Sequence, residues 1–227
     1  MLFSWIINIT DEIEMSKWDL LINEVDEERR ESISKYKFIS DKKRALIAGL
    51  LIRAMLKEIV PEYYNAINFF KNNYGKPYIK GVPELYFNIS HSGDYVCCAV
   101  SDEEVGIDVE RINLSIDIRN FKTFFPEEEW CQIISKSKNS IDNFFSLWTL
   151  KESYVKKIGK GLSKNLNSFC IYLEDPIVVV DNNEKKENEK FILRKLNDSH
   201  KFAICSRKCS EIVEKEMSVE DFIDKYY

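Results

Sequence analysis

Residues 101–111 read SDEEVGIDVER, and this stretch joins two parts of the chain that show a similar order of predicted elements. Within it, the run Val105-Gly106-Ile107-Asp108-Val109 has the composition of a β-strand. A strand, helices and further strands are predicted before it, and helices followed by strands are predicted after it. The chain is therefore predicted to be an α+β protein of two similar lobes, residues 1–104 and 105–227. No repeat at a fixed period accompanies this order, so the symmetry rests on element order alone.

Three segments carry clear helix signals. Residues 41–60 show helical apolar periodicity, with polar capping candidates at the start and Pro61 as a stop. A second helix is expected to begin near Pro126, because proline suits the first helical position and the three glutamates that follow suit the positive end of a helix dipole. The longest helix of the second part is predicted over residues 140–158, with its end at Gly159.

Several shorter runs are typical of strands. Residues 1–9 are apolar, lack a basic leader and are followed by acidic residues, so they are predicted to form a strand and not a signal peptide. The polar stretch NNEKKENEK at residues 182–190 is predicted to be a solvated hairpin loop. The remaining predicted strands cover residues 86–89, 95–100, 168–173, 177–180, 191–196 and 201–205.

The composition excludes several classes of protein. With 44% hydrophobic and 31% charged residues, and no apolar run of 18 residues, the chain is typical of a soluble globular protein without a membrane partner. A net charge of −5 argues against a general nucleic-acid-binding protein. The six cysteines lack metal-type spacing and lie mostly in apolar surroundings, which predicts reduced thiols and a cytoplasmic location.

The first candidate for chemistry lies in the central stretch. Asp108 and Glu110 are two residues apart in a predicted strand, so both carboxylates lie on the same face. Two neighbouring anions favour a divalent cation such as Mg²⁺, which prefers oxygen ligands and leaves room for substrate phosphates. The alternative interpretation is an exposed strand edge that only carries two acidic residues.

The helix predicted over residues 140–158 carries the second candidate. Glu152, Lys156 and Lys160 follow one another at intervals of four residues, which places a carboxylate and two ammonium groups along one helix face. A metal ion could bind the carboxylate and a phosphate the lysines, whereas the alternative is a solvent-exposed row of ion pairs. Trp148 is interpreted as a core-packing residue.

Two turn-like stretches are further candidates. In Asn88-Ile89-Ser90-His91-Ser92-Gly93, the side chains of Ser90 and His91 could bind a phosphate or a purine, and a capped turn explains these residues equally well. Tyr74-Gly75-Lys76-Pro77 predicts a turn with a lysine on its surface. The chain has no P-loop, G-x-G-x-x-G, H-E-x-x-H, C-x-x-C or G-x-S-x-G motif, which removes the usual support for nucleotide hydrolases, Rossmann dehydrogenases, zinc enzymes and triad hydrolases.

Taken together and in this order, the motifs resemble those of the 4′-phosphopantetheinyl transferases of the surfactin-synthetase (Sfp) type. The resemblance implies two pseudo-symmetric lobes, each a small antiparallel sheet packed on a long helix, in a monomer with its metal site in the second lobe. It also implies transfer of the 4′-phosphopantetheine group of coenzyme A to a serine of an acyl or peptidyl carrier protein, with release of 3′,5′-ADP. The motifs concerned are YGKP at residues 74–77, FNISHS at 87–92, GIDVE at 106–110, and Trp148 with KES at 151–153 and Lys156.

The resemblance also implies roles for individual residues. Asp108, Glu110 and Glu152 would bind Mg²⁺ at the pyrophosphate, and Lys156 would neutralise the α-phosphate side. The proton of the attacking serine could go to Glu152, to Glu129 or to a metal-ordered water. The coenzyme site would consist of Arg44, Lys76, Ser90 and His91 at the 3′-phosphate and adenine end, the backbone of Gly75 and Pro77 at the adenine, and Lys151 as an additional charge.

Two positions depart from the family pattern. Members often carry basic residues where this chain has Arg29 and Ser32, and a histidine where it has Lys43. One coenzyme contact could therefore be missing, or supplied by Lys35. These departures leave the predicted metal ligands unchanged.

Two other functions remain open on the residues: a Mg²⁺-dependent nuclease, which would need a basic face for DNA, and an inactive module that binds the coenzyme or the carrier protein.

The role of a run of basic residues between positions 35 and 43 is open as well. This run either docks an acidic carrier or forms a solvated surface. The run consists of Lys35, Lys37, Lys42 and Lys43, beside the aromatic residues Tyr36 and Phe38.

Overall fold

The computed structural model describes residues 1–82, 84–135 and 139–227 of the 227-residue chain. Its strands are β1 Leu2–Asn8, β2 Asn68–Lys71, β3 Pro77–Lys80, β4 Tyr86–Ser92, β5 Tyr95–Ser101, β6 Gly106–Arg111, β7 Phe169–Tyr172, β8 Val178–Asp181, β9 Glu184–Lys185, β10 Lys190–Asn197, β11 His200–Ser206 and β12 Ile212–Ser218. Its α-helices are α1 Met15–Leu21, α2 Glu27–Lys35, α3 Ile39–Ile59, α4 Glu127–Ile134, α5 Ser140–Ile158 and α6 Val219–Tyr226. Short 3₁₀ turns are η1 Ile22–Glu24, η2 Pro61–Ala66, η3 Ile118–Phe124, η5 Gly161–Ser163, η6 Leu166–Ser168 and η7 Cys209–Glu211.

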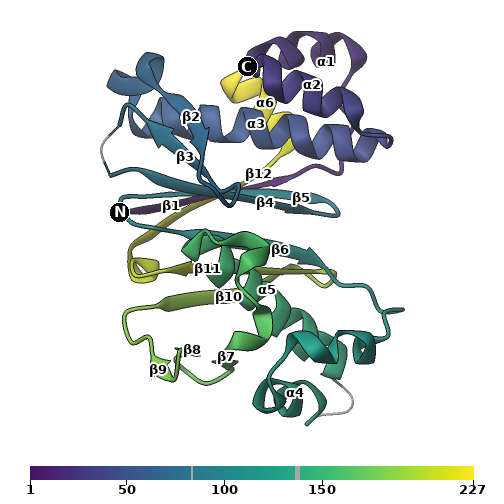
Figure 1. Ribbon diagram of the computed structural model, residues 1–227. Helices are drawn as coiled ribbons and strands as arrows, with labels where there is room; N and C mark the ends of the chain where they lie inside the picture. Colours follow the sequence, from purple (N-terminus) through teal and green to yellow (C-terminus); the bar gives the residue numbers. More distant parts are fainter. Residues whose placement is uncertain (83, 136–138) are drawn as a thin grey trace.

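Two sheets face each other and each carries a long helix on its outer side, which gives four layers (Figure 1). The first lobe contains the sheet β12-β1-β5-β4 with α3 packed on it, and the second contains the sheet β10-β11-β6 with α5 packed on it. A third apolar cluster fills the space between the two sheets. The predicted α+β class with two lobes, each a sheet on a long helix, is confirmed.

Local sequence signals account for the helix ends. The structure has α3 at Ile39–Ile59, against the predicted 41–60, and α4 begins directly after Pro126 with glutamates in its first turn. Helix α5 ends as predicted, because Gly159 adopts φ +73° and donates its N–H to the carbonyl of Val155. Lys160 therefore lies beyond the helix and does not continue the row of Glu152 and Lys156.

The predicted strands are all present, with ends that differ by up to three residues. The polar stretch 182–190 contains the turn of the β8–β9 hairpin, in which Asn182 and Asn183 adopt positive φ angles. Several elements were not predicted from the sequence: the β2–β3 hairpin, the helices α1 and α2, and the C-terminal elements β12 and α6. Of these, the β2–β3 hairpin and α2 bear directly on the candidate site.

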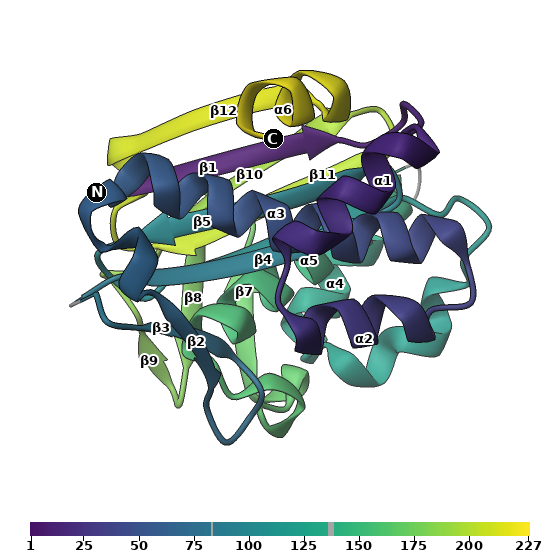
Figure 2. The same ribbon diagram turned by 90° about the horizontal axis from the view of Figure 1, so that it is seen from above.

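The C-terminal elements correct the predicted extent of the second lobe. Strand β12 pairs in parallel with β1, and Figure 2 shows β12 and α6 beside β1 in the first lobe. The apolar side chains of Val219, Phe222 and Ile223 on α6 join the core that α3 covers. The range 105–227 therefore does not form one lobe, because its last elements pack in the other one. No helix in the described part of the chain has the length and apolar character needed to cross a membrane.

Candidate functional site

The pleat of β6 sends its side chains to two different environments. Ile107 and Val109 enter the apolar cluster between the sheets, whereas Asp108 and Glu110 contact residues of α5 on the other side. The prediction that both carboxylates share one face is therefore confirmed. Asp108 is 2% exposed, so the alternative of acidic residues on an exposed edge does not apply to it.

Gly106 lets α5 approach β6 closely enough to complete this arrangement. A Cβ atom at this position would overlap the carbonyl oxygen of Ser153 and the amide of Lys157, both in the backbone of α5. Only the absence of a side chain permits this packing. The contact places the neighbouring face of α5, with Lys156, against Asp108.

Strand β4 supports β6 through side chains and not through a backbone ladder. β6 is an edge strand of its sheet, so alternate N–H groups have no strand partner. Three polar side chains of β4, at every second position, accept hydrogen bonds from these groups. The pairs are Asn88 with Ile107 at 3.0 Å, Ser90 with Val109 at 3.3 Å and Ser92 with Arg111 at 3.0 Å.

Asp108 meets one cation and keeps one oxygen free. Its Oδ1 accepts from the Ser90 hydroxyl at 2.8 Å and from the Lys156 ammonium at 2.6 Å. Its Oδ2 is buried and has no hydrogen-bond partner in the described residues. Burial raises the pKa of Asp108, and Lys156 and Ser90 oppose this rise. A buried carboxylate oxygen without a partner is costly, which indicates a ligand.

Two further carboxylates surround Asp108. Burial, followed by the charge of Asp108, raises the pKa of Glu110 to about 7 and also raises the pKa of Glu152. Glu110 accepts hydrogen bonds from Ser92 and from the indole of Trp148. Burial and the charge of Asp108 both disfavour the charged forms of the two glutamates, and a bound cation would stabilise the charged forms.

The donor set fits a hard divalent cation. It consists of carboxylate oxygens, one of them buried and unpartnered, and Mg²⁺ prefers such ligands. As the side chains stand in residues 1–82, 84–135 and 139–227, no three acidic, histidine or cysteine side chains converge into a metal-binding group. The Lys156 ammonium lies against Asp108 and supplies the compensating charge there.

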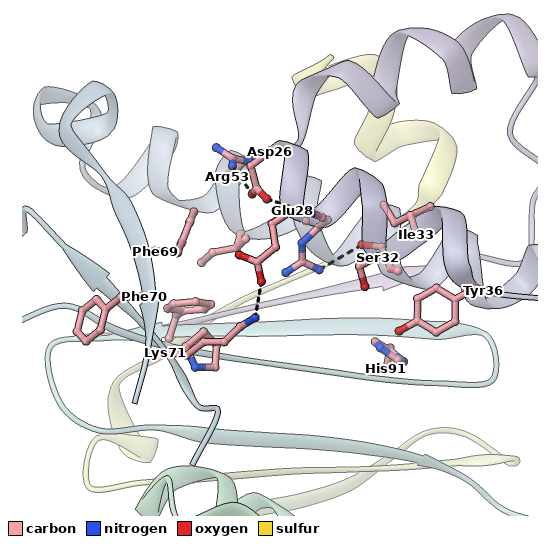
Figure 3. A pocket seen from close by; sticks show the side chains of 16 residues that line it. Asp26, Glu28, Ser32, Ile33, Tyr36, Arg53, Phe69, Phe70, Lys71 and His91 are labelled. Carbon is pink, nitrogen blue, oxygen red and sulfur yellow. Dashed lines mark hydrogen bonds and ion pairs between the residues drawn. The ribbon is translucent and has the colours of Figure 1, made fainter. Parts of the chain in front are cut away.

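A pocket of about 320 Å³ lies in the first lobe between α2, α3, the β2–β3 hairpin and the end of β4. Figure 3 shows Phe69, Phe70 and Lys71 of β2 on one side and Tyr36 with His91 on the other. Of the predicted coenzyme-site residues, the structure brings Pro77 and His91 to this pocket. The β2 residues were missed, because a strand of four residues gives little periodicity to detect.

Cations line the pocket, and acidic residues pair with two of them. Arg53 contacts Asp26 at 2.9 Å and Lys71 contacts Glu28 at 2.7 Å. Arg29 also lines the pocket and lies where Gly49 leaves space, since a Cβ there would be 2.6 Å from the Arg29 Cδ. The pocket can therefore offer positive charge to an anion beside aromatic rings suited to a planar base.

His91 connects the pocket with the carboxylate cluster. It lies between Ser90 and Ser92 on β4, so its side chain points to the opposite face from theirs. Loss of hydration, and next the charges of Lys156 and Arg44, lower the pKa of His91 below its usual value. A single strand thus presents an imidazole to the pocket and two hydroxyls to the carboxylates.

The YGKP turn has a structural anchor on α5. The Lys76 ammonium is buried, where it pairs with Glu104 and donates to the carbonyl oxygen of Lys157 at 2.8 Å. Asn72, before the turn, donates to the carbonyl oxygen of Gly159 at 2.9 Å. The hairpin tip is therefore tied to the end of α5, and Lys76 points into this junction and not onto the surface that the sequence predicted.

Two other predicted coenzyme residues lie outside the pocket lining. Arg44 donates to the carbonyl oxygen of Gly93 at 2.8 Å and pairs with Asp41 at 2.6 Å, which holds it at the turn after β4. Gly75 lies at the exposed tip of the hairpin with φ +88°. Lys43, from the basic run, donates to the carbonyl oxygens of Ile9 and Asp11.

Glu129 and Lys151 form a separate buried ion pair. Both side chains are 0% exposed, and the ammonium lies 2.7 and 2.8 Å from the two carboxylate oxygens. The amide of Ile171 also donates to Glu129, and Lys151 donates to the carbonyl oxygen of Phe169. Among the described residues, both groups are therefore engaged in internal contacts, and the roles of Glu129 as a base and Lys151 as a coenzyme contact stay predictions.

Two family profiles and several known proteins match this chain. Residues 12–103 match a family profile described as "4'-phosphopantetheinyl transferase, N-terminal", and residues 104–205 match one described as "4'-phosphopantetheinyl transferase superfamily". The chain is 38% identical over 201 residues to the 4'-phosphopantetheinyl transferase gsp of Aneurinibacillus migulanus, covering 88% of this chain and 84% of the relative.

Two further relatives extend the comparison. The 4'-phosphopantetheinyl transferase Sfp of Bacillus subtilis strain 168 is 33% identical over 182 residues, covering 79% of this chain and 80% of the relative. The L-aminoadipate-semialdehyde dehydrogenase-phosphopantetheinyl transferase of Mus musculus is 30% identical over 232 residues, covering 91% of this chain and 74% of the relative. The aligned regions span most of the chain.

Proposed function

The chain belongs to the 4′-phosphopantetheinyl transferase superfamily, and we propose that it transfers the 4′-phosphopantetheine group of coenzyme A to a serine of an acyl or peptidyl carrier protein. The observation that carries this proposal is the environment of the Asp108 carboxylate on β6. Lys156 from α5 and Ser90 from β4 both donate to one of its oxygens, and the other oxygen is buried without a partner among the described residues. The membership agrees with the resemblance noted in the motifs.

In this reaction, the serine oxygen of the carrier forms a bond to the phosphorus that bears the pantetheine arm. The bond from this phosphorus to the bridging oxygen of the pyrophosphate breaks, and 3′,5′-ADP leaves with the electron pair. Such phosphoryl transfers depend mainly on positioning and on stabilisation of charge. The Lys156 ammonium lies against Asp108 in the carboxylate cluster and is partly exposed, so it is suited to neutralise phosphate oxygens.

Asp108, Glu110 and Glu152 are proposed to hold Mg²⁺, which would polarise the phosphoryl oxygens and neutralise the charge that develops on the leaving group. The buried, unpartnered oxygen of Asp108 supports this assignment. Glu152 is also proposed to accept the serine proton, because a carboxylate can act as a general base and Glu152 lies on the same face of α5 as Lys156, one helical turn away. Glu129 is proposed to act only in the structure of the second lobe.

The pocket in the first lobe is proposed to bind the 3′-phosphoadenosine end of coenzyme A. Its aromatic side chains, Phe69 and Phe70, can stack on adenine, and Arg29 and His91 can contact the 3′-phosphate. The position of His91 on the same strand as Ser90 supports one ligand that reaches from the pocket to the carboxylates.

We also propose a monomer in the cytoplasm. The pocket and the carboxylate cluster come from a single chain, which supports a monomer, and the free cysteines of the described residues support the cytoplasm.

The test is the intact mass of a purified carrier protein after incubation with the enzyme, coenzyme A and Mg²⁺. Transfer adds one phosphopantetheine group, roughly 340 Da, as a covalent modification. Asp117→Asn serves as the matched control for Asp108→Asn, because the partner of Asp117 in the described part of the chain is the neighbouring, exposed Arg119. No mass gain with any carrier class, together with cleavage of a phosphodiester substrate, would contradict the proposal and favour a nuclease.

A further inference from the structure

We propose that Ser92 and Trp148 are positioning residues that hold the Glu110 carboxylate on the face of β6 that it shares with Asp108, where a divalent cation would bind. This inference rests on the proposed function, because it needs Glu110 to be a metal ligand. Neither side chain received such a role from the sequence, where Trp148 was interpreted as core packing. Each of the two oxygens of Glu110 accepts a hydrogen bond from one of these side chains.

Each oxygen of Glu110 has its own donor, and the donors come from different elements. The Ser92 hydroxyl of β4 donates to Oε2 at 3.2 Å, and the Trp148 indole of α5 donates to Oε1 at 3.2 Å. A glutamate has three side-chain torsions, so two donors on opposite oxygens restrict the plane of the carboxylate as well as its position. The pair thereby selects one orientation.

The Ser92 hydroxyl is itself oriented by the backbone. Its oxygen accepts the N–H of Arg111 at 3.0 Å, at the free edge of β6. The same hydroxyl therefore accepts one hydrogen bond from β6 and donates another to a side chain of β6. Ser92 therefore links the backbone of β6 to the Glu110 carboxylate on the same strand.

The Trp148 ring is held by aromatic contacts. Phe144 stacks on it with ring centroids 5.9 Å apart, and Phe121 and Phe124 meet it edge-on, each at 5.8 Å. These contacts fix the direction of the indole N–H, since rotation of the ring would break all of them. The core of the second lobe thus determines where one oxygen of Glu110 lies.

Glu110 differs from Asp108 in how it is held. Asp108 pairs with the Lys156 ammonium, whereas Glu110 forms no ion pair among the described residues and depends on neutral donors. Such donors orient a carboxylate without cancelling its charge, so the charge remains available for a cation. Partners of metal ligands commonly have this role, and their loss typically weakens metal binding by about 10- to 100-fold.

The experiment measures Mn²⁺ binding by electron paramagnetic resonance with saturating coenzyme A and no carrier protein. Ser92→Ala and Trp148→Phe are expected to weaken Mn²⁺ binding by about 10-fold each. Ser92→Thr, which keeps the hydroxyl, is expected to restore binding. Trp130→Phe is the matched control, because Trp130 is a buried tryptophan that packs on Phe125, as Trp148 does, whereas the hydrogen bonds to Glu110 come from Ser92 and Trp148.

The same variants are assayed for transfer. We expect the Mg²⁺ concentration for half-maximal rate to rise while the KM for coenzyme A stays within about twofold. Unchanged Mn²⁺ binding in both variants would overturn the inference, as would an equal loss in Trp130→Phe. Glu110→Gln tests the metal role of Glu110 separately from the positioning roles. If Glu110→Gln leaves Mn²⁺ binding unchanged, the metal role of Glu110 is wrong. If Glu110→Gln weakens Mn²⁺ binding but the Ser92 and Trp148 variants do not, the positioning role alone is wrong.

Discussion

Helix α5 carries two lysines that each pair with a buried carboxylate, and the two pairs differ in one respect. In the Glu129–Lys151 pair both side chains are 0% exposed, and both carboxylate oxygens accept hydrogen bonds. In the Asp108–Lys156 pair the lysine side chain is 28% exposed, and one oxygen of Asp108 has no partner in the described residues. The first pair is complete within the fold, whereas the second leaves one buried carboxylate oxygen without a partner among the described residues.

This difference separates two uses of a buried charge. A fully satisfied ion pair positions elements, here α4 and β7 against α5, and its loss leaves an uncompensated charge in the core. A partly satisfied pair beside solvent retains the capacity to bind a cation or a phosphate. Both lysines belong to the stretch that the sequence singled out, so residue type could not distinguish them.

The largest effect is expected from removing the incomplete carboxylate. Asp108→Asn should lower the rate of transfer by roughly 100- to 1,000-fold, the range typical for loss of electrostatic stabilisation of a transition state. The thermal unfolding temperature should change by only a few degrees, since the amide fills the same space. Transfer is measured by the mass of the carrier and folding by circular dichroism. A variant that keeps near-wild-type rates at limiting Mg²⁺ would refute the role of Asp108.

Removing the lysine of the Glu129–Lys151 pair should instead lower stability and leave the transfer activity of the folded protein unchanged. Lys151→Met should lower the free energy of unfolding by about 3–5 kcal/mol, because Glu129 loses its buried cation. Urea unfolding measures this loss, and the fraction that remains folded should retain transfer activity. Lys156→Met is the matched variant on the same helix, with a smaller loss of stability because the Lys156 ammonium is partly exposed, although Asp108 is buried. If Lys156→Met is the less stable of the two variants, the assignment of the structural role to the Glu129–Lys151 pair is wrong.

Gly106→Ala tests the contact that brings the incomplete pair together. The new methyl group would overlap backbone atoms of α5, so we expect a loss of about 1–3 kcal/mol in the free energy of unfolding. Since α5 must move away from β6, transfer should fall in the fraction that remains folded. Unfolding in urea and transfer rates measured on one preparation check both effects. Wild-type stability would show that the close approach is not needed.

A smaller effect is expected at the pocket. His91→Ala should raise the KM for coenzyme A by about 10-fold and should have less effect with dephospho-coenzyme A, which lacks the 3′-phosphate. The pKa of His91 is lowered, so the imidazole is neutral at pH 7 in the free enzyme, and a bound phosphate favours its protonated form. The KM for coenzyme A should therefore rise with pH in the wild type and respond less in the variant. Equal effects on both coenzymes would remove His91 from the 3′-phosphate.

The smallest effect concerns the basic run, where Lys35 and Lys37 are exposed beside Phe38 but Lys43 is used internally. Lys35→Glu with Lys37→Glu should raise the KM for an acidic carrier a fewfold, flatten its salt dependence and leave the KM for coenzyme A unchanged. Steady-state kinetics at two salt concentrations measures this. Should the KM for both substrates rise equally, the run would belong to the coenzyme site, and no change would assign it to a solvated surface.

Much of this fold could be predicted because its signals are local. The apolar periodicity of α3, the stop at Pro61, the glutamates after Pro126 and the left-handed Gly159 each act within a few residues of the element they end or begin. The β2–β3 hairpin escaped prediction because its strands have four residues each. The location of β12 and α6 escaped prediction because pairing with β1 joins residues more than 200 positions apart.

By itself the sequence determined that Asp108 and Glu110 share a strand face and that Glu152 and Lys156 share a helix face, because the pleat and the helical turn set these directions locally. Only the tertiary structure decided that Asp108 keeps an unpartnered oxygen while Glu129 does not, and that Lys76 is buried in a junction. The physical reason is that a side chain's partners depend on how closely distant elements approach. Here that distance is set by the missing side chain of Gly106 and by hydroxyls on β4, neither of which marks its partner in the sequence.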